Sequence, residues 1–510
     1  MTPNLLSNSI VAMCPPVEEA VKAEVAVEKI DRRAITSPPN GKLGGRPKDV
    51  FVRPEALAES LLQEQYSCNG VITLRRHCGR WYEWRGDYWH ERADGDIRAA
   101  LAGHLQARGV GEVTRLSRRT VDDVVAMLDS ARLCALDSMK YRIPCFLPSG
   151  ESAKGWMPTK NAVIDIETAA AAMERGEPIP PEATRSPSPE LFVTYGLPYA
   201  FDPTAQCPKF LKYLSEVQPS EENRECLQML AGLALVPECC YNVYFILCGD
   251  GGTGKSVFCD VLEALVGSNN VCHLPLTRFG NRFGLRPLTQ RLLNIDSDLK
   301  TITDNGYNGD LEETLKKATA GESLTVEDKG VNPWSANVTA RSVFACNSLP
   351  HIAEKGKAMW DRLRIIPFNQ RIRGTEKQNP NLAAEIIAAE LPGVLNWALV
   401  GLAKLRERQQ FPECPEGAAL KEEHRLSCDH EREFLTEHVE VAPGEWIGSQ
   451  CLYDRYREWA KGNGYHPVGA TNFKSAVMRV FPGTFTERRR LGGAQYTLYI
   501  NIRPKLGKRI

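Results

Sequence analysis

The stretch VYFILCGDGGTGKSVFCDVLEALVG (Val243–Gly267) carries the clearest fold signal of this chain. Its first five residues, Val243–Leu247, are apolar and rich in β-formers, as in a buried strand. From Val257 onward, apolar residues recur at helical spacing. Between the two lies GDGGTGKS (Gly249–Ser256), which satisfies the phosphate-binding pattern G-x-x-x-x-G-K-[ST]. The sequence therefore predicts an α/β fold of the P-loop NTPase class.

The glycines of this loop let the backbone curl so that its N–H groups face phosphate oxygens at the positive end of a helix. We expect Lys255 to reach the β- and γ-phosphates of ATP and the Ser256 hydroxyl to ligate Mg²⁺. A glycine turn without a ligand is the alternative. The expected nucleotide contacts are Gly249, Asp250, Gly251, Gly252, Thr253, Gly254, Lys255 and Ser256.

An ATPase also needs a carboxylate after a neighbouring strand, where it can hold Mg²⁺ and polarise water. The apolar run Leu292–Ile295 is followed by Asp296 and Asp298. We expect Asp298 to act as the base and Asp296 to lie near Mg²⁺, although spacing leaves the two roles interchangeable. An exposed acidic turn after a core strand is the alternative for either aspartate.

Two later segments supply groups suited to the γ-phosphate. TARSVFACN (Thr339–Asn347) is β-rich, and the amide of Asn347 at its end could orient the attacking water, unless it is only a turn former. WDRLRIIPF (Trp360–Phe368) places Arg362 and Arg364 beside another short strand. We expect Arg362 to act as an arginine finger across a subunit boundary, with Arg364 as the alternative. An ordinary ion pair is the competing interpretation.

Length and composition indicate an intracellular protein of several domains. A chain of 510 residues exceeds what one hydrophobic core holds. Its formal net charge is zero, so nucleic-acid binding must come from local patches. The sixteen cysteines include no C-x-x-C pair, which favours free thiols in a reducing cytoplasm. Polar residues interrupt the most apolar stretch, 231–248, so no membrane span is expected.

We expect the chain to divide into six segments. We expect a disordered tail or linker at 1–55, an N-terminal α+β domain at 56–205, a helical segment at 206–240, the ATPase core at 241–375, a second helical segment at 376–430 and a DNA-binding domain at 431–510.

Two parts of the N-terminal domain give local predictions. Residues 71–90 predict a hairpin around a turn at 85–87, with five aromatic residues: Trp81, Tyr82, Trp84, Tyr88 and Trp89. These aromatics could stack bases, but packing against neighbouring helices is the preferred interpretation. Glu174–Pro189, rich in Pro and Glu, is expected to be a surface loop.

The ordered set GDGGTGKS, NIDSD, GESLTVEDKG, VFACNSLP and WDRLRIIPF resembles superfamily 3 helicases of the phage/plasmid primase–helicase type, whose poxvirus and phage members have an AAA+-like core. Further similar segments lie at 159–168, 192–214, 391–405 and 451–464. The resemblance implies a ring, usually a hexamer, with ATP between subunits and single-stranded DNA in the pore. It implies the nucleotide-site roles given above and places Lys329 on a hairpin that touches DNA in the pore.

The C-terminal end resembles the winged helix of the same family. Residues 472–480 predict a helix, and 485–502 predict a hairpin that turns at Gly492 and Gly493. Phosphate contacts from basic residues here would be salt-sensitive and largely blind to sequence, and a solvated basic rim is the alternative. The candidate DNA contacts are Lys474, Arg479, Arg488, Arg489 and Arg490.

The leading hypothesis is an ATP-driven DNA helicase or translocase that serves replication of a phage, prophage or plasmid in the cytoplasm. A bifunctional primase–helicase is one alternative, for which Asp165 and Glu167 are the tempting carboxylate pair. An origin initiator that binds ATP without processive unwinding is the other.

Overall fold

The computed structural model describes residues 53–107, 118–130, 132–281, 283–299, 309–328, 331–350 and 357–505. The chain forms two compact units, one of Met1–Trp81 with Arg92–Leu136 and the other of Tyr82–Glu91 with Asp137–Ile510. The segment expected to be one N-terminal domain, 56–205, therefore contributes to both units.

In the described part of the first unit, helices surround an apolar core. They are α1 (Pro54–Gln65), α2 (Asp94–Ala107) and α4 (Arg118–Leu128). Leu61, Leu101 and Leu128 are completely buried where these helices meet. Strands β1 (Ser67–Cys68) and β2 (Val71–Ile72) pair as a short antiparallel ribbon.

The predicted hairpin at 71–90 forms part of a three-stranded sheet, in the order β3 (Leu74–His77), β4 (Arg80–Trp84), β5 (Trp89–Arg92). Its aromatic residues serve packing, as expected. Trp81 and Trp89 are both fully buried, and the rings of Tyr82 and Trp89 each meet Phe192 edge-on. Rings buried in this way are closed to base stacking.

The second unit begins with small sheets on which helix α5 (Ile166–Glu174) packs. One sheet joins β7 (Trp156–Pro158), β8 (Val163–Asp165) and β9 (Thr184–Arg185), and another joins β6 (Cys145–Phe146) with β10 (Leu191–Phe192). The prediction of a surface loop over Glu174–Pro189 is wrong only for 181–185 and for Glu174, which ends α5. Residues Pro181–Ala183 form a 3-10 turn that leads into β9, which pairs with β8.

A five-stranded parallel sheet lies at the centre of the second unit. Its order is β12 (Val271–Cys272), β13 (Leu293–Asp296), β16 (Arg341–Cys346), β11 (Tyr244–Cys248), β17 (Leu363–Pro367). The strands predicted at 243–247, 292–295 and 339–347 are confirmed within one or two residues. Because Cys248 pairs in register with Cys346 and Pro367, the carboxyl ends of β11, β16 and β17 lie at one edge.

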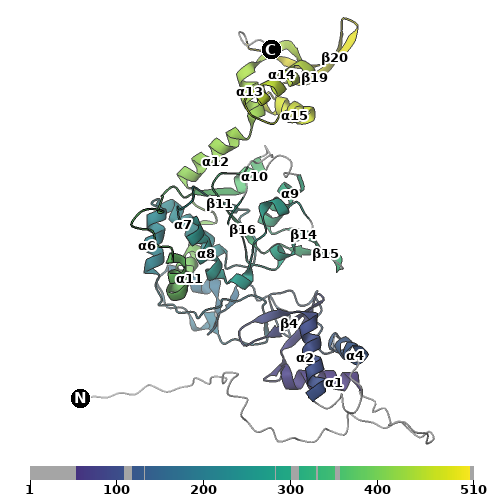
Figure 1. Ribbon diagram of the computed structural model, residues 1–510, viewed down its shortest axis with the longest axis vertical. Helices are drawn as coiled ribbons and strands as arrows, with labels where there is room; N and C mark the ends of the chain where they lie inside the picture. Colours follow the sequence, from purple (N-terminus) through teal and green to yellow (C-terminus); the bar gives the residue numbers. More distant parts are fainter. Residues whose placement is uncertain are drawn as a thin grey trace, which may run out of the picture. The chain divides into compact units, whose positions relative to one another are not determined.

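Helices cover both faces of this sheet, and alternate residues of β11 enter the two cores. Phe245 and Leu247 belong to one core, while Tyr244, Ile246 and Cys248 belong to the other. The first face carries α6 (Pro208–Val217), α7 (Glu221–Leu233), α8 (Lys255–Val266) and α11 (Leu382–Arg408). The second carries α9 (Gly309–Ala320), α10 (Lys357–Arg362), α12 (Pro415–Ser427) and the ribbon of β14 (Ser323–Asp328) with β15 (Val331–Asn337) (Figure 1).

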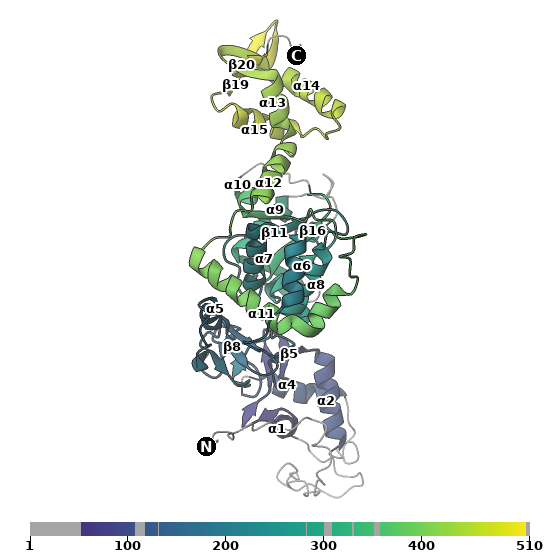
Figure 2. The ribbon, with the colours of Figure 1, turned by 90° about the vertical axis from the view of Figure 1, so that its left-hand side faces the viewer.

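Helix α11 is long and apolar enough to cross a membrane, by length and composition alone. In this fold it runs across α7 and α8 and also packs on α5 and α6 (Figure 2). Leu395, Leu399 and Leu402 are completely buried in these contacts. Packing inside the protein therefore accounts for its apolar composition.

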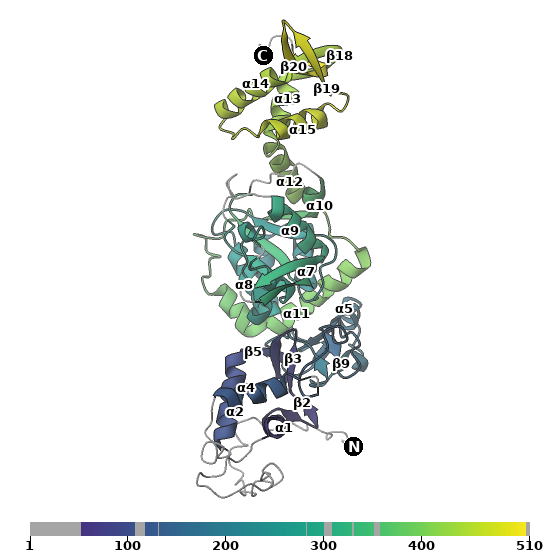
Figure 3. The ribbon, with the colours of Figure 1, turned by 90° about the vertical axis from the view of Figure 1, so that its right-hand side faces the viewer.

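The C-terminal part has its own core, formed by Phe434, Leu452, Tyr456 and Phe473. Its helices are α13 (His430–His438), α14 (Ser449–Gly462) and α15 (Ala470–Val480) (Figure 3). Its sheet has the order β18 (Val439–Gly448), β20 (Ala494–Pro504), β19 (Phe485–Leu491). The helix predicted at 472–480 and the hairpin predicted at 485–502 are both confirmed.

Candidate functional site

The glycine loop joins β11 to α8 at the carboxyl edge of the sheet. Gly252 and Gly254 have φ values of +86° and +96°, in the left-handed region that favours glycine. A Cβ at Gly249 would lie 2.2 Å from the Phe368 carbonyl oxygen, and a Cβ at Gly254 would lie 2.8 Å from Cγ1 of Val217. The curled backbone therefore depends on glycine at each of these positions.

Lys255 lies inside the curl rather than pointing into solvent. Its side chain is buried, and Nζ donates to the carbonyl oxygens of Gly249 and Asp250, the second at 2.9 Å. Nζ also lies 3.5 Å from Oδ1 of Asn347, a residue 92 positions later in the chain. Burial lowers the pKa of Lys255. The fold thus places Lys255 next to Asn347, whereas the sequence predicted each of them as a site residue without showing that they are close.

The two aspartates follow β13 at the same edge of the sheet. Asp296 is half-buried, and its carboxylate accepts from the backbone N–H groups of Leu276 and Asp298, both at 3.4 Å. Burial raises its pKa. Asp298 is exposed. Since β16 separates β13 from β11, the aspartates lie two strand spacings, roughly 10 Å, from the glycine loop.

A phosphate chain fits this edge, and so does a magnesium ion held partly by that chain. Ser256 is exposed at the first turn of α8, where backbone N–H groups favour anions. Within the described residues no group of three His, Cys, Asp or Glu side chains could hold a metal. Ser256, Asp296 and Asp298 would therefore need phosphate oxygens or water to complete the oxygen-rich sphere that Mg²⁺ prefers.

Arg362 and Arg364 lie away from this edge. In the parallel pairing of β17 with β11, Leu363 is opposite Tyr244 and Arg364 is opposite Phe245, at the start of both strands. Arg364 is therefore about 10 Å, or three residues, before the carboxyl edge. Arg362 Nη1 donates to Ala358 O on its own helix at 2.8 Å, and Arg364 Nη1 donates to Asp361 O at the same distance.

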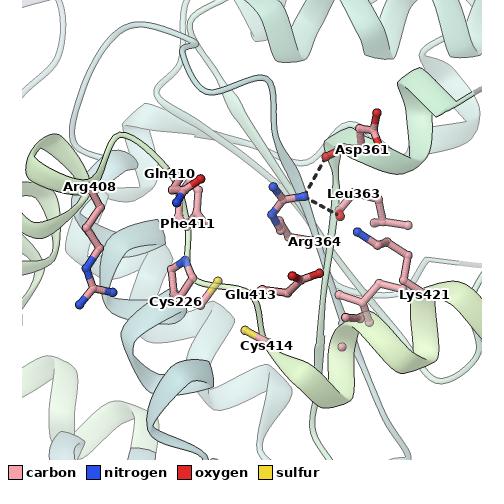
Figure 4. Close-up of a pocket in the computed structure, with 14 residues that line it drawn as sticks. Cys226, Asp361, Leu363, Arg364, Arg408, Gln410, Phe411, Glu413, Cys414 and Lys421 are labelled. Atoms are coloured by element: carbon pink, nitrogen blue, oxygen red, sulfur yellow. Dashed lines mark hydrogen bonds between the residues drawn. The ribbon is translucent and has the colours of Figure 1, made fainter.

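Arg364 lines a pocket of about 480 Å³ beside β17 (Figure 4). Glu413 and Lys421 also line it, and Figure 4 shows their side-chain ends near the Arg364 guanidinium. Burial and then the Arg364 charge lower the pKa of Lys421. Arg362 does not line this pocket. The structure therefore separates the two arginines: Arg364, the alternative in the sequence-based prediction, lines the pocket, and Arg362, the preferred residue, does not.

Sequence reasoning missed two residues that fix the glycine loop. The Tyr213 hydroxyl on α6 donates to Gly254 O at 2.8 Å, and burial raises its pKa well above its usual value. The Arg373 backbone N–H donates to Gly252 O at 3.0 Å, and a Cβ on Gly252 would lie 2.4 Å from Arg373 Cβ. Arg373 is exposed at the loop. The doubled arginine in RIR, 371–373, is the one sequence signal of a basic site here.

The basic residues of the C-terminal part differ in what they contact. Arg479 forms an ion pair with Asp429 at 2.8 Å, and Arg489 forms one with Glu487 at 2.9 Å. Lys474, Arg488 and Arg490 are exposed, and Arg488 and Arg490 alternate with Arg489 along β19. Lys329 lies outside the described residues.

Asp165 and Glu167, the carboxylate pair considered for priming, both make structural contacts. Asp165 caps α5, where its carboxylate accepts from the N–H groups of Glu167 and Thr168 and from the Thr168 hydroxyl. Glu167 accepts from the Arg406 guanidinium on α11, with a shortest distance of 2.6 Å. The two carboxylates therefore have separate structural partners.

The fold and this edge define an α/β protein built on a parallel sheet with a strand–glycine loop–helix junction. Family models match the chain in three places: "D5 N terminal like" at residues 59–219, "Family of unknown function (DUF5906)" at 247–362 and "Poxvirus D5 protein-like" at 432–503. The N-terminal and C-terminal parts of the chain are therefore similar to D5-type proteins.

Viral relatives match about half of the chain. "Putative helicase 022R" of Frog virus 3 (isolate Goorha) is 21% identical over 51% of this chain and 28% of its own length. "Putative helicase L207/L206" of Acanthamoeba polyphaga mimivirus is 24% identical over 49% of this chain and 28% of its own. The match thus spans little more than a quarter of each relative. The apo NrS-1 C-terminal region has a TM-score of 0.48 at 12% identity, covering 88% of this chain and 99% of that one.

Proposed function

We propose that this chain is an ATP-dependent DNA helicase or translocase that works in replication of a phage, prophage or plasmid. One observation carries the proposal. Lys255, Asn347 and the two aspartates lie at the carboxyl edge of the sheet, while Arg362 and Arg364, the two candidates for the arginine finger, lie at its amino end. A second copy of the chain could supply an arginine to this edge, as ATP hydrolysis at subunit interfaces requires.

Each residue has a definite task in this proposal. Lys255 holds the β- and γ-phosphates of ATP, and Asn347, beside it, orients the attacking water. Asp298 is the better base, because both oxygens of Asp296 already accept from backbone N–H groups and Asp298 is exposed. Mg²⁺, held by Ser256 and Asp296, would neutralise charge on the phosphates.

Arg364 is the better candidate for the arginine finger, which reverses the preference drawn from sequence. Both guanidinium groups donate to a carbonyl of α10, but only Arg364 lines a pocket, and the Nε of Arg362 is buried without a partner among the described residues. A finger from a neighbouring protomer would stabilise charge on the transferred phosphoryl group. The assembly proposed is a homo-hexameric ring in the cytoplasm of a bacterial or infected cell.

DNA is the proposed partner. Single-stranded DNA would pass through the pore near Lys329, and the C-terminal part would bind duplex or fork as a winged helix. Its helix α15 and the β19–β20 hairpin support this assignment, with Lys474, Arg488 and Arg490 exposed for phosphate contacts.

The test is ATP hydrolysis and strand separation with and without single-stranded DNA. Wild type should show DNA-stimulated turnover, and Lys255→Ala should lose both activities. The matched control is Lys212→Ala, an exposed lysine on α6, which should keep them. Unwinding by Lys255→Ala at the wild-type rate would contradict the proposal.

An origin initiator that binds ATP without turnover is the second candidate. The exposed basic residues of the C-terminal part suit either function, but Asn347 beside Lys255 favours hydrolysis. Tight ATP binding with no turnover on any DNA would favour the initiator. Priming is disfavoured because Asp165 and Glu167 have structural partners.

A further inference from the structure

Two cysteines lie side by side directly under the glycine loop. Cys248 is the last residue of β11, and Cys346 is the last residue of β16. The parallel pairing puts them in register, and both side chains enter the same core. Neighbouring strands are about 4.8 Å apart, within the range of Cα separations that a disulfide spans, about 4.4–6.8 Å.

The surroundings make one of these thiols reactive. A hydrogen bond with the Cys346 thiol and the charge of Lys255 lower the pKa of Cys248 to about 7, although burial opposes this. The same contact and burial raise the pKa of Cys346. A thiolate that forms near neutral pH beside a cation is typical of cysteines that react with oxidants.

A third cysteine of the same sheet shows the contrast. Cys272 on β12 is equally buried, and its Sγ donates to the Leu293 carbonyl at 3.6 Å and to Asn294 Oδ1 at 3.4 Å, whereas the Sγ of Cys248 has one longer contact of this kind, 3.9 Å to the Asn347 carbonyl. Burial raises the pKa of Cys272 to about 12. Burial in this sheet therefore does not itself create a reactive thiol. The thiol neighbour and the lysine do.

We propose that Cys248 and Cys346 form a thiol-oxidation site that responds to a peroxide. The Cys248 thiolate attacks one oxygen of hydrogen peroxide and breaks the O–O bond. Taking up one proton, this step leaves a sulfenic acid on Cys248 and releases water. The Cys346 thiol then attacks the Cys248 sulfur, a disulfide forms, and the hydroxyl leaves with the thiol proton as a second water.

The disulfide would alter the nucleotide site, an inference that rests on the proposed function. The residue after Cys248 is Gly249, and the residue after Cys346 is Asn347. A covalent link would fix both strand ends and remove the thiolate that faces Lys255. Displacements of about 1 Å at an active site can cost about a hundredfold in rate. Oxidation should therefore suppress ATP hydrolysis until a dithiol reductant restores it.

The site itself is tested by chemistry that needs no nucleotide. Full-length wild type is treated with hydrogen peroxide, the remaining thiols are alkylated, and the peptides are mapped by mass spectrometry. We expect a peptide pair joined through Cys248 and Cys346, lighter by two hydrogen atoms and separated by dithiothreitol. Cys272→Ala should give the same pair. In Cys346→Ser, whose hydroxyl can still donate to the Cys248 thiolate but cannot form a disulfide, Cys248 should stop at the sulfenic acid, which dimedone traps.

Two results would overturn the site. One is full alkylation of Cys248 and Cys346 after a treatment that oxidises the exposed Cys451. The other is a disulfide between Cys226 and Cys414, another adjacent thiol pair, with Cys248 left free. Both are read from wild type, so neither depends on whether a variant folds.

The effect on activity is a separate measurement. Peroxide-treated wild type should lose ATP hydrolysis on the order of a hundredfold and recover with dithiothreitol. Cys272→Ala should respond in the same way. If the disulfide forms and turnover is unchanged, the control of activity is refuted while the oxidation site stands. If reduced wild type never hydrolyses ATP, the proposed function fails and peptide mapping still decides the site.

Discussion

The two ends of the central sheet differ in what they hold. At the carboxyl edge, the glycine loop closes around Lys255, and Asn347 and the aspartates lie nearby. At the amino end of β17, Arg364 lines an open pocket with Lys421 and Glu413. The first end carries the groups that we propose to bind phosphate, and the second carries a cationic pocket without a glycine loop. Because Arg364 lies about 10 Å before the carboxyl edge, the proposed function takes its arginine finger from a second copy of the chain.

The largest expected effect comes from a substitution at the amino end of β17. Arg364→Ala should lower kcat about a thousandfold, because an arginine finger contributes at least that much in related chemistry. The KM for ATP should change little, since Arg364 lies away from the glycine loop of its own chain. Steady-state ATP hydrolysis with saturating single-stranded DNA measures both constants.

Mixing two inactive variants tests whether Arg364 of one protomer acts at the glycine loop of another. Arg362→Ala is the matched control and should keep most of its activity. Arg364→Ala mixed with Lys255→Ala should regain part of the wild-type rate, because some interfaces then combine an intact loop with an intact arginine. No recovery in the mixture would argue that the two ends do not meet.

A smaller effect is expected within the glycine loop. Gly249→Ala should weaken ATP binding about a hundredfold and lower the free energy of unfolding by about 1–3 kcal/mol, because its Cβ would overlap the Phe368 carbonyl. Gly251→Ala is the control, since no atom lies within 4 Å of its Cβ. Binding of a fluorescent ATP analogue and urea denaturation measure the two quantities. Equal affinity of both variants for the ATP analogue would contradict the predicted overlap between a Cβ at position 249 and the Phe368 carbonyl.

Arg373 should contribute to ATP binding at the carboxyl edge. Its backbone is bound to the loop and its side chain is exposed there. Arg373→Ala should weaken ATP binding about tenfold, which corresponds to about 1.4 kcal/mol. Arg371→Ala, two residues earlier, is the control and should bind like wild type. Identical dissociation constants for ATP in the two variants would show that the Arg373 side chain does not contribute to ATP binding.

The smallest effect concerns DNA and should leave both ends of the sheet unchanged. The double variant Arg488→Ala with Arg490→Ala should reduce the salt dependence of DNA binding, by about one unit of slope for each phosphate that is no longer bound. ATP hydrolysis without DNA should stay at the wild-type rate. Arg489→Ala should matter less, because Arg489 pairs with Glu487. DNA titrations over a range of salt concentrations give the slopes, and an unchanged slope would exclude these arginines.

Local features of the fold could be predicted from sequence, and pairings across long distances could not. The order of strand, glycine loop and helix at 243–267 is confirmed because periodicity and glycine positions are local signals. The approach of Lys255 to Asn347 depends on the order of the strands, which tertiary packing decides. For the same reason the sequence, which favoured Arg362, could not show that Arg364 is the arginine that lines a pocket.

Other misses also have physical causes. Pro and Glu dominate the surroundings of β9 and predict a loop there, yet pairing with β8 outweighs that local composition. Asp165 and Glu167 suggest a metal pair by their spacing, but one caps a helix and the other binds a distant arginine. The Cys248–Cys346 pair gives no signal in the sequence, since 98 positions separate residues that register makes neighbours.

Strand β17 is the last strand on its side of the sheet, and an uncovered last strand invites pairing with another chain. Helix α12 covers it so closely that a Cβ on Gly417 would lie 2.0 Å from the Ile365 carbonyl oxygen. Copies of this chain therefore cannot fuse into a continuous β-structure on that flank. Any multimer formed there must rest on side chains, which leaves each protomer free to pivot against the next.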